Sequence, residues 1–442
     1  MTVHRYRSKQ MLTELERISE LARENRQLQF LSIAHLLTPV ALKEAFKSLR
    51  KDASAGVDGI TYGEYQKEAG QKIQQLHERV RGKRYRAQPQ RRVYIPKENG
   101  KQRAISIPSL EDKILQKATV TLLNAVYEQD FYPCSFGFRP GKSQQDALDA
   151  VGRIVCRRPI GWVLEADISG YFDAIARKEL IEMIKRRVKD GSILRLIGKW
   201  INVGVIDEGR LLMSDTGVGQ GQVVSPLLAN IYLHYVLDEW FEQQVKPRLR
   251  GEAHEVRFAD DFILCFQYKE DAMRVMEVLR KRFAKYGLTL HTEKTRLIEF
   301  GKNAVMKSER PGGKLPETFD FLGFTHVATR SRRGYFTIHV RTMRKRLRRS
   351  LKAVAEWCHE HMHDTLTEQQ NSLNTKLRGH YEYYGRPTNY QCLWQFYRVV
   401  RRIWKECLNR RTRGRTVTWE KFGHIIASFP LQPPRITKAW AR

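Results

Sequence analysis

The sequence predicts an α+β protein that ends in a helical, strongly basic segment. Residues 1–300 mix apolar residues at helical spacing with short runs of β-branched and aromatic residues, which is the pattern of an α+β fold. After residue 342, two long helical patterns dominate. The 442 residues are 41% hydrophobic and 10% aromatic, so the chain has enough apolar surface for a core and is not a disordered protein.

The charge of the chain points to a polyanionic partner. Lys and Arg number 79 against 48 Asp and Glu, which gives a net charge of +31. The excess is uneven, since the segment from Arg332 to Arg442 holds 24 basic residues and 7 acidic ones. A nucleic acid is therefore the expected partner, and a merely soluble basic protein is the less favoured alternative.

The sequence predicts a cytoplasmic protein without membrane contact. No stretch approaches the ~20 apolar residues of a membrane span, and the N-terminus lacks the apolar core of a signal peptide. The six cysteines are scattered without a CxxC pair, which fits a reducing compartment and argues against zinc ribbons. In a bacterial cell we expect association with the nucleoid when the protein acts on DNA.

Short β-prone runs predict strands at three places in the first 300 residues. VYIPKENGKQRAISIPS, residues 93–109, reads as a basic strand-turn-strand. The run from Trp162 to Ala166 leads directly into Asp167. The segments 256–259 and 262–266 flank Asp260 and Asp261, which predicts a hairpin with two adjacent carboxylates at its tip.

Adjacent carboxylates at a strand junction point to a divalent cation. Like charges side by side are destabilising unless something positive lies between or beyond them, and oxygen ligands suit Mg²⁺. Two strands that each end in a carboxylate can lie side by side and share two metal ions, the arrangement that serves in-line phosphoryl transfer. The two aspartates alone are weak evidence, because an ordinary Asp-rich turn has the same letters.

The C-terminal quarter predicts helices after a loop over residues 302–318. An apolar stripe begins at Met343 and recurs to Cys358, with basic residues over the rest of that surface. A docked helix that presents phosphate contacts is favoured over a solvated charged face. A second helix is expected from Leu393 to Leu408, and its aromatic residues suit a core better than a base-stacking platform.

Two segments resemble the motifs that define a known family. RFADDFILCF, residues 257–266, resembles the [YF]xDD motif of reverse transcriptases, and ADISGYFD, residues 166–173, resembles their first catalytic motif. Further blocks follow in the family's order, and the resemblance covers roughly residues 30–410. These blocks are residues 93–109, 136–148, 217–241, 287–301 and 319–326.

The resemblance implies a right-hand polymerase, with an antiparallel palm sheet between fingers and an α-helical thumb. The expected parts are an N-terminal extension and start of the fingers (1–60), fingers and palm (61–330), a thumb/maturase domain X (331–410) and a short basic C-terminal extension (411–442). That extension suits either DNA contact or a packed cap on the thumb.

The resemblance also implies roles for individual residues. The catalytic residues would be Asp167, Asp260 and Asp261. Two Mg²⁺ ions, for which Mn²⁺ can substitute, would be held by Asp167, Ile168, Asp260 and Asp261. The incoming nucleotide would contact Lys97, Arg103, Phe172, Gln220 and Lys294, with Phe172 as the steric gate against a 2′-hydroxyl. The nucleic acid would contact Arg139, Arg344, Lys345, Arg348, Arg349 and Arg378.

Within this family the chain is most similar to group II intron-encoded reverse transcriptase/maturases. SAGVDGITYGEY (54–65) and FRPGKSQQDAL (138–148) are typical of that group, and LNTKLRGHYEYYG (373–385) resembles maturase domain X. The implied partners are group II intron RNA, an RNA template with a DNA primer, target DNA and dNTPs. The implied role is to assist splicing and to copy the intron into DNA during retrohoming.

Two departures from the family pattern and two alternative roles complete the prediction. Residues 218–221 read VGQG where most members read TPQG, and no His- and Cys-rich nuclease segment precedes Arg442, so second-strand cleavage is not expected.

A domesticated relative in DNA repair or antiviral defence would share the chemistry. An RNA chaperone with a vestigial centre is disfavoured by the three aspartates. The HExxH match over residues 359–363 is best explained by chance.

Overall fold

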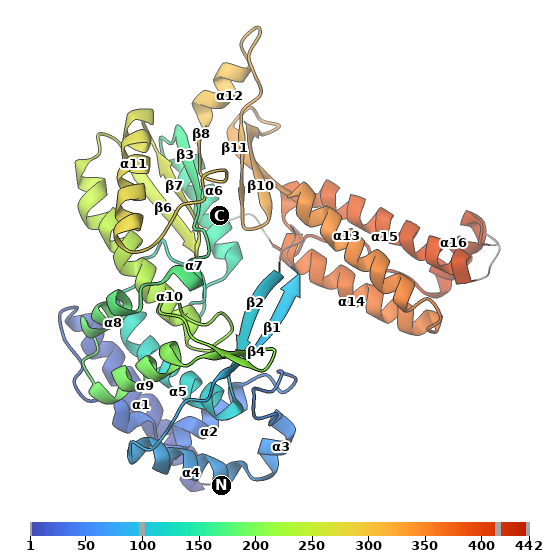
Figure 1. Ribbon diagram of the computed structural model, residues 1–442. Helices are drawn as coiled ribbons and strands as arrows, with labels where there is room; N and C mark the ends of the chain where they lie inside the picture. Colours follow the sequence, from blue (N-terminus) through green and yellow to red (C-terminus); the bar gives the residue numbers. More distant parts are fainter. Residues whose placement is uncertain (1, 97–101, 412–416, 439–442) are drawn as a thin grey trace.

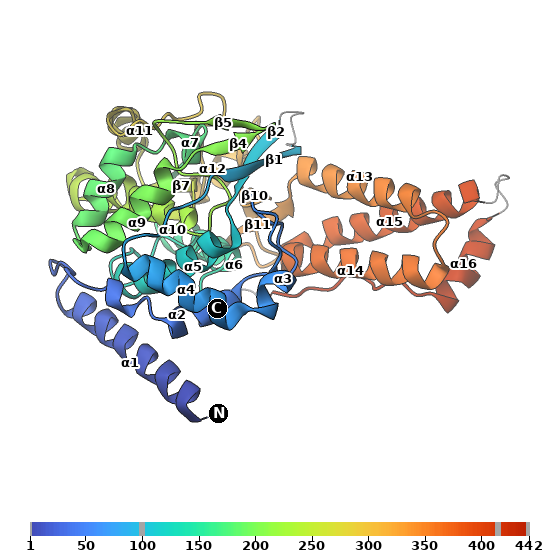
Figure 2. The same ribbon diagram turned by 60° about the horizontal axis from the view of Figure 1, so that its bottom comes forward.

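The computed structural model describes residues 2–96, 102–411 and 417–438. It consists of a body of mixed helices and sheets and a helical unit that projects from one side (Figure 1). The unit projects from the body in Figure 2 as well, so the two views agree on two distinct parts. The α+β class predicted from the sequence is confirmed.

Helices build the end of the body that contains the N-terminus (Figure 1). Two begin with reciprocal caps expected from their sequences: Thr61 and Glu64 bond each other's backbone N–H groups at α3, and Ser143 and Asp146 do so at α6. The helices of the body are α1 (Thr2–Glu24), α2 (Pro39–Ser48), α3 (Tyr62–Lys67), α4 (Ala69–Arg81), α5 (Leu110–Tyr127), α6 (Gln144–Arg157), α7 (Tyr171–Ala174), α8 (Arg177–Lys185), α9 (Gly191–Asn202), α10 (Ser225–Leu233), α11 (Lys269–Lys285) and α12 (Lys302–Ser308). Short π-helices η2 (His234–Asp238) and η3 (Phe241–Val245) extend α10, and the 3₁₀ turns are η1 (Ala34–Leu36), η4 (Lys246–Arg248) and η5 (Pro387–Asn389).

The strand-turn-strand predicted over 93–109 is present as an antiparallel pair in a small sheet. Its strands are β1 (Gln90–Pro96) and β2 (Gln102–Ile107), joined by β4 (Val205–Asp207) and β5 (Arg210–Leu212) in the order β2-β1-β4-β5. The pairs are antiparallel except β1 with β4. The turn between β1 and β2 lies outside the described residues.

A second antiparallel sheet lies at the centre of the body, in the order β6-β7-β3-β8. Its strands are β6 (Ala253–Phe258), β7 (Asp261–Phe266), β3 (Trp162–Asp167) and β8 (Arg296–Glu299). Alternate residues of each strand enter two different cores: Leu164 and Phe262 face the core of the body, whereas Val163 and Ile263 face a core shared with the third sheet and the helical unit. The near-continuous apolar runs seen in the sequence therefore mark a sheet that is buried on both faces.

The third sheet and the helix before it differ from two predictions: the domain division at residue 331 and the loop over residues 302–318. The strands of this sheet are β9 (Thr318–Phe321), β10 (Phe324–Arg330) and β11 (Phe336–Thr342), in the order β11-β10-β9. The division at residue 331 would separate β11 from β10, with which it pairs over its full length, so the helical unit begins at Arg344 instead. The loop over 302–318 is wrong in its first part, because α12 forms there with Ala304 and Val305 buried.

The helical unit contains α13 (Arg344–Glu360), α14 (Leu366–Tyr384), α15 (Tyr390–Arg411) and α16 (Trp419–Ser428). The predicted apolar stripes are confirmed, with Leu347 and Val354 of α13 and Trp404 of α15 buried in one core. The C-terminal segment packs as a cap, since Phe422 of α16 is fully buried with its ring 5.8 Å from Trp404. Most of the basic run at 411–415 lies outside the described residues.

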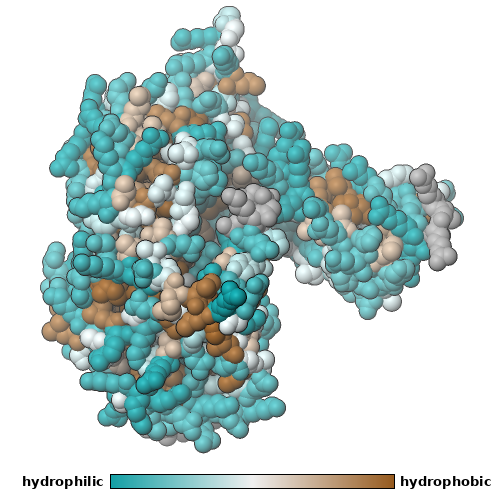
Figure 3. Space-filling model, in the orientation of Figure 1, coloured by the Kyte–Doolittle hydropathy of each residue, from teal (hydrophilic) through white to brown (hydrophobic). Residues whose placement is uncertain are grey.

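The surface is largely hydrophilic on the face shown in Figure 3, with hydrophobic side chains in small separate groups. In the described segments, no helix combines the length and the apolar character needed to cross a membrane.

Candidate active site

Three aspartates meet where two strands of the central sheet end. Asp167 is the last residue of β3, and Asp261, the first residue of β7, lies directly opposite it in the register of the antiparallel pair. Asp260 occupies the two-residue turn between β6 and β7. The hairpin predicted from the sequence is confirmed, and the sheet brings its tip beside the carboxylate that ends β3.

The surroundings of Asp260 and Asp261 disfavour the charged form of both carboxyls. Burial raises the pKa of Asp261 to about 7, and the charges of Asp260 and Asp167 add to the rise. Burial also raises the pKa of Asp260, with a further contribution from Asp167, while Arg103 opposes it. Asp260 and Asp261 are each partly exposed as whole residues. A bound cation would relieve the repulsion, and carboxylate oxygens are the ligands that Mg²⁺ prefers.

A lysine supplies the positive charge beside Asp167. The Lys294 ammonium lies 2.5 Å from a carboxylate oxygen of Asp167, and its side chain is 61% exposed. Nowhere in the described chain do three His, Cys, Asp or Glu side chains lie close enough to hold a metal together. This holds for Asp167, Asp260 and Asp261 as well, which lie at the same edge of the sheet without forming such a group, and for the His359–His363 segment. The carboxylates fit a divalent metal by chemistry and charge, and the exposed Lys294 side chain can turn away from Asp167.

The backbone at Ile168 continues the sheet beyond the last residue of β3. The Asp167 carbonyl accepts from the His291 N–H at 2.8 Å, and Ile168 forms an isolated bridge with Leu290. The Ile168 side chain is buried. Only its main-chain carbonyl could therefore contact a metal ion.

The loop after residue 216 joins the first catalytic segment to the small sheet. The Val218 N–H donates to the carbonyl of Phe172, and the Gln220 carbonyl accepts from the Ser106 N–H of β2 at 2.7 Å. Phe172 is half-buried in α7, and Arg103 is exposed on β2. The loop thus links the segment that follows β3 to β2, and Arg103 of β2 is near enough to Asp260 to lower the pKa of that carboxyl. Lys97 lies outside the described residues.

Two glycines of this loop lie close to neighbouring strands and side chains. A Cβ at Gly219 would lie 2.6 Å from the Gln90 side chain, and Gly221 has a φ of +114° with the Ser106 carbonyl 2.7 Å from an added Cβ. At Gly221 the positive φ and the nearby main chain of β2 favour glycine, whereas the side chains near Gly219 could shift. A cavity of about 430 Å³ is lined by these strands and by the loop, including Gln220.

Arg139 lies inside the protein and does not fit the predicted nucleic-acid contact. Its side chain is 7% exposed and forms an ion pair with Glu128 at 3.0 Å. It also donates to the carbonyls of Tyr132 and Ser135. The sequence could not distinguish this arginine from an exposed one, because its partners come from the preceding helix end and loop.

The remaining predicted nucleic-acid contacts lie on the surface of the helical unit. Arg344, Lys345, Arg348 and Arg349 are exposed along α13, on the side away from buried Leu347. Arg378 is exposed on α14. The structure therefore gathers four of these residues on one helix face and places Arg378 on a neighbouring helix.

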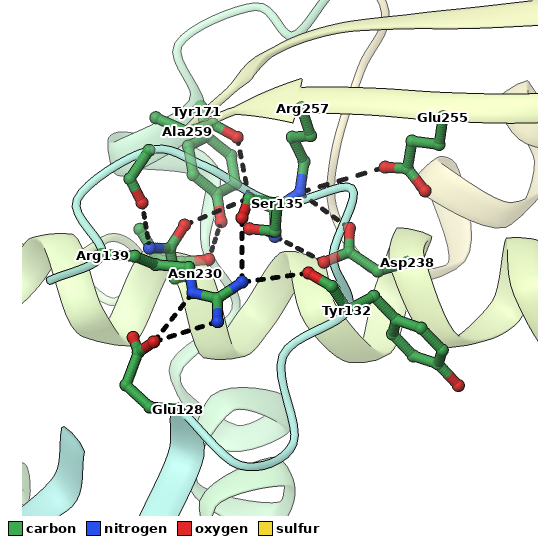
Figure 4. A network of polar contacts seen from close by, with 12 residues as sticks. Glu128, Tyr132, Ser135, Arg139, Tyr171, Asn230, Asp238, Glu255, Arg257 and Ala259 are labelled. Atoms are coloured by element: carbon green, nitrogen blue, oxygen red, sulfur yellow. Dashed lines mark hydrogen bonds and ion pairs between the residues drawn. The ribbon is translucent and has the colours of Figure 1, made fainter. Parts of the chain in front are cut away.

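A buried polar network beneath the hairpin turn was missed from the sequence. Arg257, Asp238, Asn230 and Ser135 converge there, and all four are at most 1% exposed (Figure 4). The available signal was a pair of opposite charges at alternate positions, Glu255 and Arg257, in the short strand before the turn.

Comparisons with known proteins agree with this geometry. Residues 95–326 match the family profile described as "Reverse transcriptase (RNA-dependent DNA polymerase)". The chain is 31% identical to Protein YkfC of Escherichia coli K12 over 73% of this chain and 90% of that protein. It is 30% identical to the Group II intron-encoded protein LtrA of Lactococcus lactis, over 66% of this chain but only 50% of that protein.

A shorter match is to the uncharacterized 91 kDa protein in the cob intron of Schizosaccharomyces pombe, at 36% identity over 38% of this chain and 21% of that protein.

Proposed function

Because this chain belongs to the reverse transcriptases, and among them to the intron-encoded reverse transcriptase/maturases, we propose that it extends a DNA primer along an RNA template at the Asp167–Asp260–Asp261 cluster. The observation that carries the proposal is the register pair of Asp167 and Asp261, with Asp260 in the adjoining turn. This places three carboxylates at one edge of the central sheet.

Asp167, Asp260 and Asp261 would hold Mg²⁺, together with the main-chain carbonyl of Ile168. Bound there, the metal supplies positive charge to the phosphates of the nucleotide and lowers the pKa of the primer hydroxyl. Reverse transcriptases in general use divalent metal ions of this kind. The raised pKa values of Asp260 and Asp261 support the proposal, because burial, and secondarily the neighbouring aspartates, disfavour charged forms that a bound cation would stabilise.

The other residues around the cluster bind and orient the nucleotide in this proposal. Arg103 projects from β2, exposed and near enough to Asp260 to lower the pKa of that carboxyl. Lys294 releases Asp167 and turns to the departing pyrophosphate. The Phe172 ring lies beneath the sugar and excludes a 2′-hydroxyl, which selects dNTPs.

The helical unit is the proposed thumb, and the basic face of α13 its RNA contact. Four exposed Lys and Arg residues on one helix suit the phosphate backbone of structured RNA, and buried aromatics hold that helix in place. The partner we propose is group II intron RNA, which the protein would help to splice and then copy during retrohoming. The similarity to LtrA supports this role.

The experiment that tests the function has two parts. Purified protein should extend a DNA primer on an RNA template in the presence of Mg²⁺ and dNTPs. Sequencing of the RNA that copurifies from its host should then find one dominant structured intron. Absence of primer extension contradicts the polymerase, whereas polymerase activity without an enriched intron contradicts the maturase role.

A further inference from the structure

The hairpin turn that carries Asp260 has a strained backbone. Ala259, the first residue of the turn, has a φ of +59°, in the left-handed region that residues other than glycine rarely adopt. In two-residue hairpin turns whose first residue alone has a positive φ, this position usually belongs to glycine. Such a conformation persists only where the surroundings hold it.

A buried guanidinium holds the turn from below (Figure 4). Arg257 is 0% exposed, and one Nη1–H donates to the Ala259 carbonyl at 3.0 Å. The other Nη1–H donates to Asn230 at 3.1 Å. Nε and Nη2 donate to both carboxylate oxygens of Asp238 at 2.7 and 2.5 Å, and Nη2 donates to the Ser135 hydroxyl at 2.8 Å. All five N–H groups of the arginine are thus used, and a lysine has only three donors.

The acceptors belong to elements that enclose the turn. The Asn230 amide donates to the Gly137 carbonyl at 2.6 Å, and a Cβ at Gly137 would lie 2.1 Å from the Ala259 nitrogen. The main chain of Arg257 also accepts from the Phe136 N–H at 2.8 Å. Arg139 belongs to the same support, because its guanidinium holds the Ser135 carbonyl. The segment 134–137 and the α10–η2 helix therefore both contact the turn or the arginine beneath it.

The charge of this network is balanced within the protein interior. Asp238 forms the ion pair with Arg257, and both side chains are 0% exposed. Glu255 lies farther away, with a carboxylate oxygen 4.0 Å from Nε. Burial, and secondly the neighbouring Asp238, raise the pKa of Glu255 well above its ordinary value, which favours its neutral form. One carboxylate thus neutralises one guanidinium, as a buried pair requires.

We propose that Arg257 is a positioning residue for DNA synthesis: its bond to the Ala259 carbonyl holds the left-handed turn and so aims Asp260 and Asp261 at the reaction centre. The inference rests on the proposed polymerase function. It differs from a purely stabilising role, because the guanidinium bonds the turn itself and not only the surrounding core.

The chain offers a matched control in Arg187. This arginine is also buried, with 3% of its side chain exposed, and pairs with Asp130 at 2.8 Å. It donates to main-chain carbonyls as well, at Ala22, Asn25 and Leu28. None of these partners belongs to the catalytic hairpin. Arg187→Lys therefore perturbs a buried pair of the same kind at a distance from the site.

The test compares Arg257→Lys, Asn230→Ala and Arg187→Lys by thermal unfolding, hydrogen exchange and primer-extension kinetics. Both lysine variants should unfold at lower temperature. Only Arg257→Lys and Asn230→Ala should speed amide exchange in peptides covering residues 254–266. Only these two should lower kcat, by on the order of ten- to a hundredfold, with the KM for dNTP within about threefold of the wild-type value.

Three results would overturn the proposal: unchanged exchange in the turn, a kcat loss no larger than in Arg187→Lys, or a loss confined to KM. Should Arg257→Lys fail to fold, Asn230→Ala provides the test. This variant keeps the Arg257–Asp238 pair and removes two hydrogen bonds, the one from the guanidinium to Asn230 and the one from Asn230 to the Gly137 carbonyl. If the wild-type protein extends no primer, the proposed function fails. The exchange comparison then still decides whether Arg257 holds the turn.

Discussion

Asp260 and Asp261 are neighbours in sequence but differ in surroundings. Asp261 lies in the sheet register opposite Asp167 and accepts weakly from the Leu322 N–H at 3.4 Å, whereas Asp260 lies in the turn and faces Arg103. Burial raises the pKa of both carboxyls. Each residue can therefore serve a different part of one metal site, and each can be tested alone.

Replacing Asp260 with Asn should abolish metal-dependent DNA synthesis, because an amide cannot supply the negative oxygen ligand. A loss of several kcal/mol of transition-state stabilisation corresponds to a rate at least about a hundredfold lower. Primer extension at saturating dNTP measures this, and filter binding should show nearly unchanged RNA affinity. Glu270→Gln, an exposed carboxyl in the first turn of α11, is the control and should keep full activity. Similar rates for Asp260→Asn and the control would refute the assignment.

Phe172→Ala should admit ribonucleotides, because the ring would no longer exclude a 2′-hydroxyl. The main-chain bond from Val218 to the Phe172 carbonyl does not depend on the side chain, so the loop should stay in place. The measurement is the ratio of kcat/KM for dNTP and NTP. A ratio equal to that of the parent enzyme would show that Phe172 does not act as the gate.

At the scale of elements, helix α13 has two faces: an apolar stripe that packs in the core of the helical unit, and a basic face that is exposed to solvent. Changing Arg344, Lys345, Arg348 and Arg349 together to Gln should weaken RNA binding and reduce its salt dependence. Removal of a single phosphate-binding charge lowers the slope of log K against log salt by roughly 0.7–0.9. Binding titrations at several salt concentrations measure the slope.

A control for α13 with the same change in charge is available on α11, on the opposite side of the molecule in Figure 1. Four of its exposed basic residues are Arg274, Arg280, Lys281 and Lys285. Their replacement by Gln should leave the slope close to that of the wild-type protein. Equal slopes for both fourfold variants would mean that α13 does not contact RNA.

Strand β10 contains a histidine that should make the fold sensitive to acid. His326 is 1% exposed and stacks on Phe319 at 4.6 Å. Burial, and secondly Arg386, lower its pKa to about 3 from 6.5. Between pH 6.5 and 3, His326 is therefore protonated in the unfolded chain but neutral in the folded one. The free energy of unfolding falls as the pH drops through this range. At pH 5 the cost is about 2 kcal/mol.

His326→Phe should reduce this acid sensitivity, since phenylalanine keeps the ring stack and cannot be protonated. The measurement is the difference in unfolding free energy between pH 7 and pH 5. This difference should be about 2 kcal/mol smaller in the variant. An identical difference in both proteins would show that His326 does not contribute.

At the scale of the whole molecule, the body and the helical unit are joined through α6. Arg386 of the unit donates to Gln145 of α6 at 2.6 Å and pairs closely with Asp149, and Gln145 donates to the Tyr383 carbonyl at 2.9 Å. The Arg386 side chain is only 10% exposed. In the proposed polymerase this junction sets the position of the thumb over the primer and template.

Asp149→Asn should loosen the junction, because the nearly buried guanidinium loses its counter-charge. We expect the free energy of unfolding to fall by about 1.5–3 kcal/mol. Products made in one binding event should become shorter, while addition of the first nucleotide is retained. Primer extension with a trap for released enzyme measures both.

The matched control is Arg435→Gln, which breaks an exposed pair with Glu382 within the C-terminal part of the chain. Its product lengths should equal those of the wild-type protein. Product lengths in Asp149→Asn that match the control would argue against a role of the junction in holding the thumb.

The sequence by itself determined the elements whose cause is local. Alternation and β-branched runs predicted β3 and the β6–β7 hairpin, and helical spacing predicted α13 and α15, because these patterns depend on residues a few positions apart. The order of the motifs also placed Asp167, Asp260 and Asp261 at strand ends. α12 was missed because its short sequence lies in a polar stretch.

Only the tertiary structure decided which polar side chains face inward. Arg139 and Arg257 are ordinary arginines in the sequence, yet both are buried. The partners of Arg139 lie at most 11 positions away, whereas Arg257 also has partners on distant segments that the fold brings to it. For Arg257 these include Ser135, which is 122 positions away in the sequence. Burial of a charge is tolerated only where a counter-charge and hydrogen-bond acceptors surround it. That condition depends on long-range packing, and no local pattern can report it.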